Sequence, residues 1–345
     1  MLQRKTTLPT LYVESVLLDS GAVRILDRRV FPFSKEFVVC ANHEEVAIAI
    51  EQMVTQSNGP FYAAGGGMVL EARAAERERD PVRRLHMMKA AGARLVRTRP
   101  TNNNISTAIR SILVFAEEHA AGNGFADAVE KFVLDQWEGR RSQARAVGRH
   151  ANSLVADGER ILTHCWSEGA LLETLAAAKD EGKRIELLCT ETRPYLQGAR
   201  LTAHSAAEMG IDTTVIADGM VAHAMASGRV SMLMTAADRV TMSGHVINKV
   251  GTLNAAIAAR HFKVPYFATV LRPDPKAPTP ADVPIEERDG DETLYCLGIR
   301  TASPLAKGWY PAFDVTPPEL VSGVVTERGI FAAAALPQSF PAQHL

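Results

Sequence analysis

Three side chains suited to acid–base chemistry and anion binding follow apolar segments in the second half of this 345-residue chain: Cys165, Asp238 and Lys249. A thiol has an ordinary pKa of about 8.5 and a carboxyl one of about 4, so a site that brings both toward neutrality holds a proton donor and a proton acceptor. Lys249 adds a positive charge, which suits a phosphate ligand. A single cysteine is more often a packing residue, so the prediction depends on these groups meeting at one site.

The elements that must bring these groups together are short strands alternating with helices from residue 160 onward. We expect strands over 160–165, 184–190, 211–217, 230–235 and 264–270, and helices over 170–180, 197–209, 219–227 and 252–261. Glycines close three of the helices, at Gly182, Gly210 and Gly228. The alternation is typical of right-handed crossovers and predicts an α/β fold with a doubly wound parallel sheet.

The predicted strands end in polar residues. The first ends in Thr163-His164-Cys165, the second runs into Glu191-Thr192-Arg193, the third ends at Asp218 and the fourth near Asp238. Ligands of open parallel sheets bind beyond the carboxyl ends of the strands. We therefore expect the thiol, the carboxyl and the amine to converge on one crevice.

The first part of the chain has a different pattern. Two short strands are expected over 15–18 and 23–26, followed by helices over 42–55, 104–120 and 126–157, the last of which stops at Gly158. This predicts a mostly helical N-terminal domain with a small antiparallel sheet over 1–130 and a C-terminal α/β domain over 131–345.

Composition excludes several classes of protein. Hydrophobic residues make up 46%, and 38 Lys+Arg against 39 Asp+Glu give a net charge of -1, so we expect neither a nucleic-acid nor a membrane partner. The four cysteines form no C-x-x-C pair, and the spacing of the histidines fits no ligand motif, so no metal site is expected. Without a leader pattern or a long apolar stretch, the chain is expected to be cytoplasmic.

A run of three glycines, Gly65 to Gly67, lies outside the α/β region. The third position of a dinucleotide fingerprint is occupied by Leu70, and neither a P-loop nor a G-x-S-x-G elbow occurs. The run predicts either a tight turn or a backbone nest for an anion, which makes Gly66 and Gly67 candidate substrate-binding residues.

Ordered blocks over most of the chain resemble the S-methyl-5-thioribose-1-phosphate isomerase family. The blocks are LDRR at 26–29, EFVVC at 36–40, EEVA at 44–47, TRPTNNN at 98–104, ILTHC at 161–165, TRPYLQGARLT at 192–202, ADRV at 237–240, NKVGT at 248–252 and PAFDVTPP at 311–318. The same fold family includes ribose-1,5-bisphosphate isomerase and the regulatory subunits of the eukaryotic guanine-nucleotide exchange factor for translation initiation.

The resemblance implies a Rossmann-like C-terminal domain, a homodimer, no nucleotide or metal cofactor, and a place in methionine salvage. Residue by residue, it assigns catalytic roles to Cys165 and Asp238. It assigns substrate binding to Arg99, Gln197, Asn248 and Lys249. The implied activity is an aldose–ketose isomerisation of a C1-phosphorylated, 5-substituted pentose, with S-methyl-5-thioribose 1-phosphate as the leading candidate.

The sequence departs from the family pattern at two places. The region around Gly65 lacks the family's substrate-holding arginine, and the usual Asn-Ala-Gly after the cysteine is replaced by Trp166-Ser167-Glu168-Gly169. Alternatives are therefore an isomerase of 5-deoxyribose 1-phosphate or ribose 1,5-bisphosphate, or a regulatory subunit without catalysis. The pair Cys165 and Asp238 favours an enzyme.

The implied chemistry has a specific requirement. A sugar phosphorylated at C1 cannot open freely, so the ring oxygen must be protonated before hydrogen moves from C2 to C1. Asp238 is expected to give the ring-opening proton and Cys165 to take the C2 proton; the reverse assignment and a direct hydride shift stay open. Arg99 and Lys249 would hold the phosphate, with amides at the start of the helix at Thr252.

Overall fold

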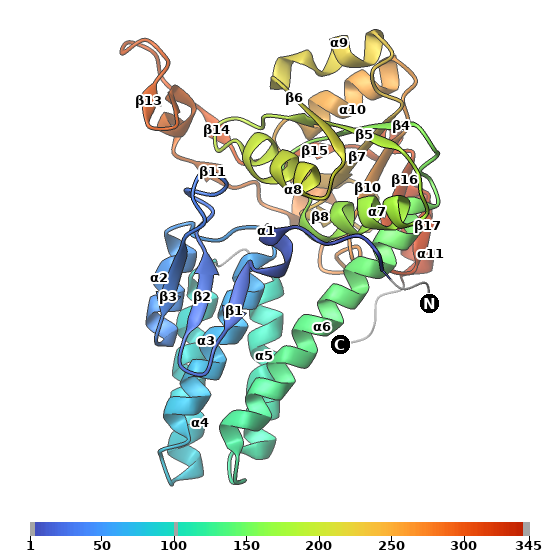
Figure 1. The fold of residues 1–345 in the computed structure, drawn as a ribbon. Coiled ribbons are helices and arrows are strands. Elements are labelled where there is room, and N and C mark those ends of the chain that lie inside the picture. The colour runs from blue at the N-terminus through green and yellow to red at the C-terminus, as the bar shows by residue number, and fades with distance from the viewer. Residues whose placement is uncertain (1–3, 100–102, 341–345) are drawn as a thin grey trace. The chain divides into compact units, whose positions relative to one another are not determined.

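The computed structural model describes residues 4–99 and 103–340, and these form two compact units (Figure 1). One unit is Thr10–Ser142, and the remaining described residues form the other. Helix α6 (Phe125–Asn152) has residues in both units, and the expected division at 130/131 falls within this helix. Each unit is described separately below.

The Thr10–Ser142 unit is mostly helical with a small antiparallel sheet, as predicted. Its strands are β1 (Val16–Leu18), β2 (Val23–Leu26) and β3 (Phe37–Cys40), in the order β1-β2-β3. Besides α6, its helices are α1 (Thr10–Val13), α2 (His43–Glu51), α3 (Gly59–Ala75), α4 (Pro81–Arg97) and α5 (Asn103–His119). Strand β3 and helices α3 and α4 were not predicted.

The expected turn at the glycine run is wrong, because Gly65 to Gly67 lie within α3. A Cβ at Gly66 would lie 2.7 Å from Val23 Cγ2, and one at Gly67 would lie 3.3 Å from Leu95 Cδ1. The glycines therefore let α3 pack closely against β2 and α4. Amides inside a helix are bonded to its own carbonyls, so the run forms no nest for an anion.

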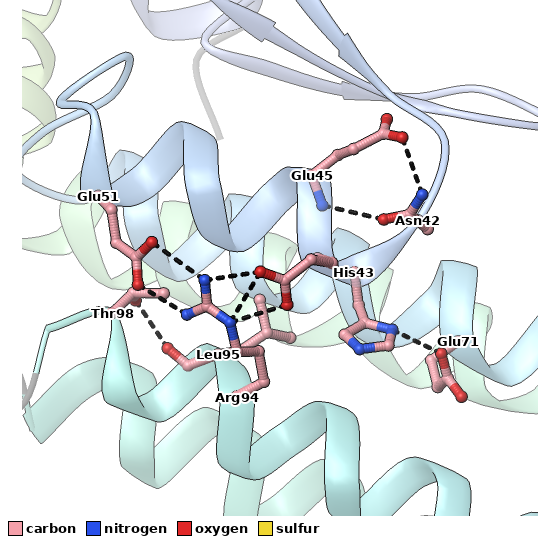
Figure 2. A network of polar contacts seen from close by, with 9 residues as sticks. Asn42, His43, Glu45, Glu51, Glu71, Arg94, Leu95 and Thr98 are labelled. Atoms are coloured by element: carbon pink, nitrogen blue, oxygen red, sulfur yellow. Dashed lines mark hydrogen bonds and ion pairs between the residues drawn. The ribbon is translucent and has the colours of Figure 1, made fainter.

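Polar contacts join α2 to α4 (Figure 2). Arg94 of α4 binds two carboxylates of α2, with Nε 2.8 Å from Glu44 Oε2 and Nη1 2.6 Å from Glu51 Oε1. Asn42 caps α2 by accepting a hydrogen bond from the Glu45 backbone N–H at 2.9 Å. These contacts fix the C-terminal end of α4, just before Arg99.

The second unit contains a seven-stranded, mostly parallel sheet in the order β17-β16-β10-β7-β4-β5-β6. Its strands are β4 (Glu159–Thr163), β5 (Ile185–Thr190), β6 (Asp212–Ile216), β7 (Met232–Ala236), β10 (Tyr266–Thr269), β16 (Gly323–Thr326) and β17 (Gly329–Phe331). Only β17 pairs antiparallel. The α/β prediction and its five strands are confirmed; β16 and β17 were not expected.

The order of the strands reverses at β4. From this strand the chain adds β5 and β6 on one side, and it then adds β7, β10 and β16 on the other. Beyond such a reversal, the loops after neighbouring strands turn apart and leave room for a ligand. The strands on either side of the reversal are β4 and β7, which precede Cys165 and Asp238.

Helices connect the strands close to where they were predicted. They are α7 (Glu168–Asp180), α8 (Ala203–Glu208), α9 (Val221–Ala226) and α10 (Thr252–His261). The expected helix over 197–209 begins as a π-helical segment, Gly198–Thr202. The three predicted glycine stops all have positive φ, from 70° to 80°.

Smaller elements complete this unit. They are the antiparallel sheet β15-β9-β8 (Phe313–Thr316, Val246–Lys249, Arg239–Val240), the pairs β11 (Glu287–Arg288) with β14 (Tyr310–Pro311) and β12 (Tyr295–Cys296) with β13 (Ile299–Arg300), and α11 (Leu336–Ser339). The core of the main sheet is apolar and includes Leu162, Leu188, Leu233 and Val324. In the described part of the chain, no helix combines the length and the apolar character needed to cross a membrane.

Candidate active site

Cys165 lies two residues beyond β4 rather than inside the predicted strand. Its backbone has a φ of 67°, a left-handed conformation that is uncommon for a residue with a side chain. Its N–H donates to Thr192 Oγ1 at 3.0 Å, and its carbonyl accepts from Thr202 Oγ1 at 2.6 Å. The segments after β4 and β5 therefore hold the thiol in place together.

Asp238 lies two residues beyond β7, the parallel neighbour of β4. The backbone N–H of Ala236 donates to Ser167 Oγ at 3.0 Å, which ties the end of β7 to the segment after Cys165. Asp238 and Cys165 interact electrostatically, since the carboxylate raises the pKa of the thiol. The structure thus places the two predicted catalytic side chains at the same edge of neighbouring strands.

Displacement of water by the surrounding protein raises the pKa of both groups. The pKa of the Cys165 thiol rises to about 11, because burial disfavours the thiolate more than the positive charge of Lys249 favours it. Asp238 is an exposed residue. The protein atoms around its carboxyl still displace water and raise its pKa, while Lys249 and Arg239 oppose this shift. At neutral pH the thiol is therefore protonated.

Lys249 ends β9 and is 8% exposed. Its Nζ donates to Tyr310 Oη at 3.3 Å and lies 4.9 Å from the centre of the Phe313 ring. Within residues 4–99 and 103–340 we find no ion pair between Lys249 and a carboxylate. With these aromatic and hydroxyl neighbours, the buried ammonium group is available to an anionic ligand.

Asn248, which precedes Lys249, is also buried. Its Nδ2 donates to Thr252 Oγ1 at 2.9 Å, and this hydroxyl in turn donates to the Lys249 carbonyl at 2.7 Å. The amide group is therefore oriented by the first residue of α10.

The start of α10 does not offer the phosphate donors that were expected. Asp314 Oδ2 accepts from the Gly251 N–H at 2.7 Å and from the Leu253 N–H at 3.1 Å. Burial raises the pKa of Asp314 to about 6, although these amides oppose the shift. Because a carboxylate already accepts from the Gly251 and Leu253 amides, the expected use of amides at the start of this helix for phosphate is wrong at these two residues.

Gln197 lies just before the π-helical segment and is 6% exposed. Its Oε1 is buried and has no hydrogen-bond partner among the described residues. A buried acceptor without a donor costs about 1–3 kcal/mol, so it suits a ligand that brings a donor. A Cβ on the next residue, Gly198, would lie 1.8 Å from the Thr190 carbonyl oxygen, so only glycine allows this close approach to β5.

His164, one of the polar residues at the predicted strand ends, has a structural role beside Cys165. Its Nδ1 lies 2.6 Å from Thr190 Oγ1, and its Nε2 lies 2.9 Å from the Val250 carbonyl oxygen. A carbonyl can only accept, so Nε2 carries the hydrogen and Nδ1 accepts from the threonine. Burial lowers the pKa of His164, which keeps the ring neutral.

The other predicted binding residues belong to the Thr10–Ser142 unit. Arg99 follows α4, and its guanidinium contacts the Ile50 carbonyl oxygen at 3.4 Å and the Met53 sulfur. Gly66 and Gly67 pack inside this unit, as described above. Of the block at 98–104, residues 100–102 lie outside the described residues.

Sequence reasoning missed the partners that hold the site. Thr190, Thr192 and Thr202 fix His164 and Cys165, while Tyr310 and Asp314 contact Lys249 and its following turn. Thr192 could have been found from the sequence, because it follows a predicted strand among other polar residues. The other partners contact the site from segments that are far away in the chain, so no local pattern indicates them.

Comparison with known proteins identifies the family of this chain. Residues 63–333 match the model of the initiation factor 2 subunit family. The methylthioribose-1-phosphate isomerase of Thermotoga neapolitana is 35% identical over 321 residues, covering 90% of this chain and 92% of that protein. The protein of the same name from Thermosipho melanesiensis is 36% identical over 317 residues, covering 89% and 91%.

Solved structures agree with this family. The structure of 5-methylthioribose 1-phosphate isomerase from Pyrococcus horikoshii OT3 has a TM-score of 0.84 at 29% identity and covers 95% of this chain and 96% of its own. The structure described as translation initiation factor eIF-2B, subunit delta, from A. fulgidus has a TM-score of 0.81 at 30% identity and covers 96% and 99%. The chain therefore belongs to the initiation factor 2 subunit family and, with its relatives from Thermotoga and Thermosipho, to the family of the methylthioribose-1-phosphate isomerases.

Proposed function

We propose that the protein is an aldose–ketose isomerase, an intramolecular oxidoreductase that converts S-methyl-5-thioribose 1-phosphate to the corresponding ribulose 1-phosphate. One observation carries the proposal: Cys165 and Asp238 lie at the carboxyl ends of β4 and β7, where the strand order reverses. The names of the relatives from Thermotoga and Thermosipho support the same activity.

In this proposal the Cys165 thiol is the proton donor and the Asp238 carboxylate is the proton acceptor. This is the reverse of the assignment expected from the sequence, which was left open there as an alternative. A thiol with a pKa of about 11 is neutral at pH 7, so in the resting enzyme it can give a proton but not take one. It protonates the ring oxygen while the bond from C1 to that oxygen breaks. Hydrogen then moves from C2 to C1, and the Asp238 carboxylate takes the proton released as C2 becomes a carbonyl.

The path of the migrating hydrogen has a direct readout. If the hydrogen leaves C2 as a proton, reaction in D₂O puts deuterium at C1 of the product; if it moves as a hydride, C1 stays unlabelled. The raised pKa of Asp238 suits either path, because a more basic carboxylate accepts a proton more readily.

Substrate binding uses the buried polar groups. Lys249 binds the C1 phosphate, and the Gln197 Oε1, which has no donor among the described residues, accepts a hydrogen bond from a sugar hydroxyl, as does Asn248. Arg99, in the Thr10–Ser142 unit, stays a predicted substrate-binding residue. Gly66 and Gly67 take part only through the close packing of α3 that they allow.

The charge around the site favours a neutral group at C5. Asp238, Asp218 and Glu286 all add negative charge close to the reacting groups, since each raises the pKa of Cys165 or Asp238. A second phosphate, as in ribose 1,5-bisphosphate, would meet this charge with Lys249 already used at C1 and with Arg239, the other cation that acts on Asp238, paired with Asp274 at 3.5 Å. A methylthio or deoxy C5 avoids that repulsion.

The wider proposal includes a homodimer, a Rossmann-like C-terminal domain over 131–345 and a cytoplasmic role in methionine salvage. The strand order, with the first strand central, supports the Rossmann-like description. All four cysteines are free thiols, which suits a reducing compartment. Light scattering after size-exclusion chromatography tests the dimer.

A panel of pentose 1-phosphates tests the activity, with ketose formation followed by NMR. We expect conversion of the methylthio sugar, slower conversion of 5-deoxyribose 1-phosphate and none of ribose 1,5-bisphosphate. A folded protein that converts none of them would be a non-catalytic member of the family, and the proposal would fail.

A further inference from the structure

Asp218, which follows β6, binds two successive backbone amides of the segment after β5. Its Oδ1 accepts from the Thr192 N–H at 2.8 Å and its Oδ2 from the Arg193 N–H at 2.8 Å. Thr192 has a φ of 62°, which is unfavourable for a β-branched residue and persists only where the surroundings enforce it. The two charge-assisted hydrogen bonds are suited to enforcing it.

Thr192 in turn reaches the catalytic segment. Its side chain is fully buried, and its Oγ1 accepts from the Cys165 N–H at 3.0 Å and lies 3.2 Å from Thr190 Oγ1. Thr190 also contacts the His164 ring. A continuous set of hydrogen bonds therefore runs from the end of β6 through the end of β5 to the residue that carries the thiol.

We propose that Thr192 and Asp218 are positioning residues for the Cys165 thiol: Asp218 fixes the left-handed turn at Thr192, and the Thr192 hydroxyl fixes the left-handed backbone of Cys165. This rests on the proposed function of Cys165 as proton donor. Neither residue has to touch the substrate. Without the Thr192 oxygen, the Cys165 N–H loses its acceptor, and the strained segment relaxes away from the geometry that proton transfer needs.

The electrostatic effect of Asp218 on Cys165 provides a second readout. Asp218 raises the pKa of the thiol, whereas Lys249 lowers it. The other groups that act on the thiol are Asp238, which raises its pKa, and the Trp166 amide, which lowers it. Loss of the Asp218 charge should therefore lower the thiol pKa, whereas Thr192→Val removes no charge, so a changed alkylation profile in that variant reports the altered geometry of Cys165.

The test uses three variants of the full-length protein: Thr192→Val, Thr192→Ser and Asp218→Asn. We measure kcat, KM and the pH dependence of Cys165 alkylation by iodoacetamide, resolved by peptide mass spectrometry. Thr213→Val removes a partly buried hydroxyl on β6 that, among residues 4–99 and 103–340, bonds only the Ile211 carbonyl of its own segment. Asp180→Asn removes a carboxylate that likewise accepts from two successive amides, those of Lys5 and Thr6. These are the matched controls.

We expect Thr192→Val to lower kcat about 10- to 100-fold with KM changed by less than about threefold. Thr192→Ser keeps the hydroxyl, so its kcat should stay near that of the wild type. Asp218→Asn should lower kcat and shift the alkylation midpoint below that of the wild type. Both controls should match the wild type. A Thr192→Val protein with native circular dichroism, wild-type kcat and an unchanged alkylation profile would overturn the proposal.

The same measurements separate this inference from the proposed function. If the wild type converts no sugar phosphate but Thr192→Val, which removes no charge, still shifts the alkylation profile of Cys165, positioning holds and the isomerase proposal fails. If the wild type is active, and neither Thr192→Val nor Asp218→Asn changes kcat or the alkylation profile of Cys165, the positioning proposal fails while the isomerase proposal stands.

Discussion

The His164 ring and Gly251 lie so close together that a methyl group on the glycine would be 2.8 Å from His164 Cε1. Gly251 also has a φ of 106°, a conformation that a residue with a Cβ rarely adopts. We therefore expect Gly251→Ala to lower the free energy of unfolding by about 2 kcal/mol or more, from strain plus the clash. It should also lower kcat, because the clash displaces the residue next to Cys165.

Gly182→Ala is the control for backbone strain alone. Gly182 has a φ of 80°, and a Cβ there would meet nothing within 4 Å. Urea unfolding should show a cost of about 1–2 kcal/mol with kcat unchanged. Equal effects of the two substitutions on kcat would contradict the role given to the contact with His164.

Cys165→Ser should lower kcat about 100- to 10,000-fold, the usual contribution of a positioned acid or base. The hydroxyl keeps the shape of the side chain, so the unfolding midpoint and substrate binding should stay near those of the wild type. Isothermal titration with the sugar phosphate measures binding. Cys296→Ser, at a partly exposed free cysteine, should be fully active, and wild-type turnover by Cys165→Ser would remove the proton-donor assignment.

The protonation of Cys165 can be read from its alkylation rate as a function of pH. The midpoint should lie near 11, since the thiolate is the reactive form and appears only as the pH rises through the thiol pKa. Asp238→Asn removes a negative charge and should lower the midpoint, whereas Lys249→Met removes a positive charge and should raise it. A midpoint near neutral pH in the wild type would instead favour Cys165 as the base.

Lys249→Met should raise KM for the sugar phosphate about 10- to 100-fold, which corresponds to the loss of a charge-assisted contact of about 1.5–3 kcal/mol. Because the methionine leaves no buried charge, the unfolding free energy should stay the same or rise. Inhibition by inorganic phosphate should weaken in parallel. Lys179→Met is the control, since that ammonium bonds the Met209 carbonyl oxygen at the end of α8; an unaltered KM in Lys249→Met would exclude Lys249 from phosphate binding.

Gly66→Ala tests the packing role of the glycine run. A Cβ there would lie 2.7 Å from Val23 Cγ2, so we expect a loss of about 1–3 kcal/mol in unfolding free energy, with KM unchanged wherever the protein is folded. Gly139→Ala, in α6 with nothing within 4 Å, should instead stabilise by about 1 kcal/mol through helix propensity. A raised KM in a Gly66→Ala protein that is still folded would instead support the original prediction that Gly66 contacts the substrate.

The sequence predicted the parts of the fold that depend on local pattern. Alternating apolar segments and glycine stops located five strands of the main sheet and the helices that connect them. Helix α3 was missed because its glycines have low helix propensity, and only the neighbouring Val23 and Leu95 explain them. Strand β16 follows a long irregular segment that offers no periodic signal.

Only those site residues that follow directly after a predicted strand could be located from the sequence. Cys165 and Asp238 could be placed together because parallel strands share a carboxyl edge, whereas Lys249 ends β9 of the small antiparallel sheet. That Asp314 would occupy the amides before α10, or that Thr192 would receive the Cys165 N–H, depends on tertiary contacts between distant segments. Such contacts leave no spacing in the sequence to detect.

The central place of β4 has a consequence for how the protein is made. This strand leaves the ribosome before every other strand of its sheet, and it gains a partner on one edge when β5 emerges but waits for β7 on the other. Until then, one row of backbone hydrogen-bonding groups beside the future reaction centre lies open to wrong pairing. Chaperone dependence of the nascent chain should therefore fall sharply once translation has passed β7.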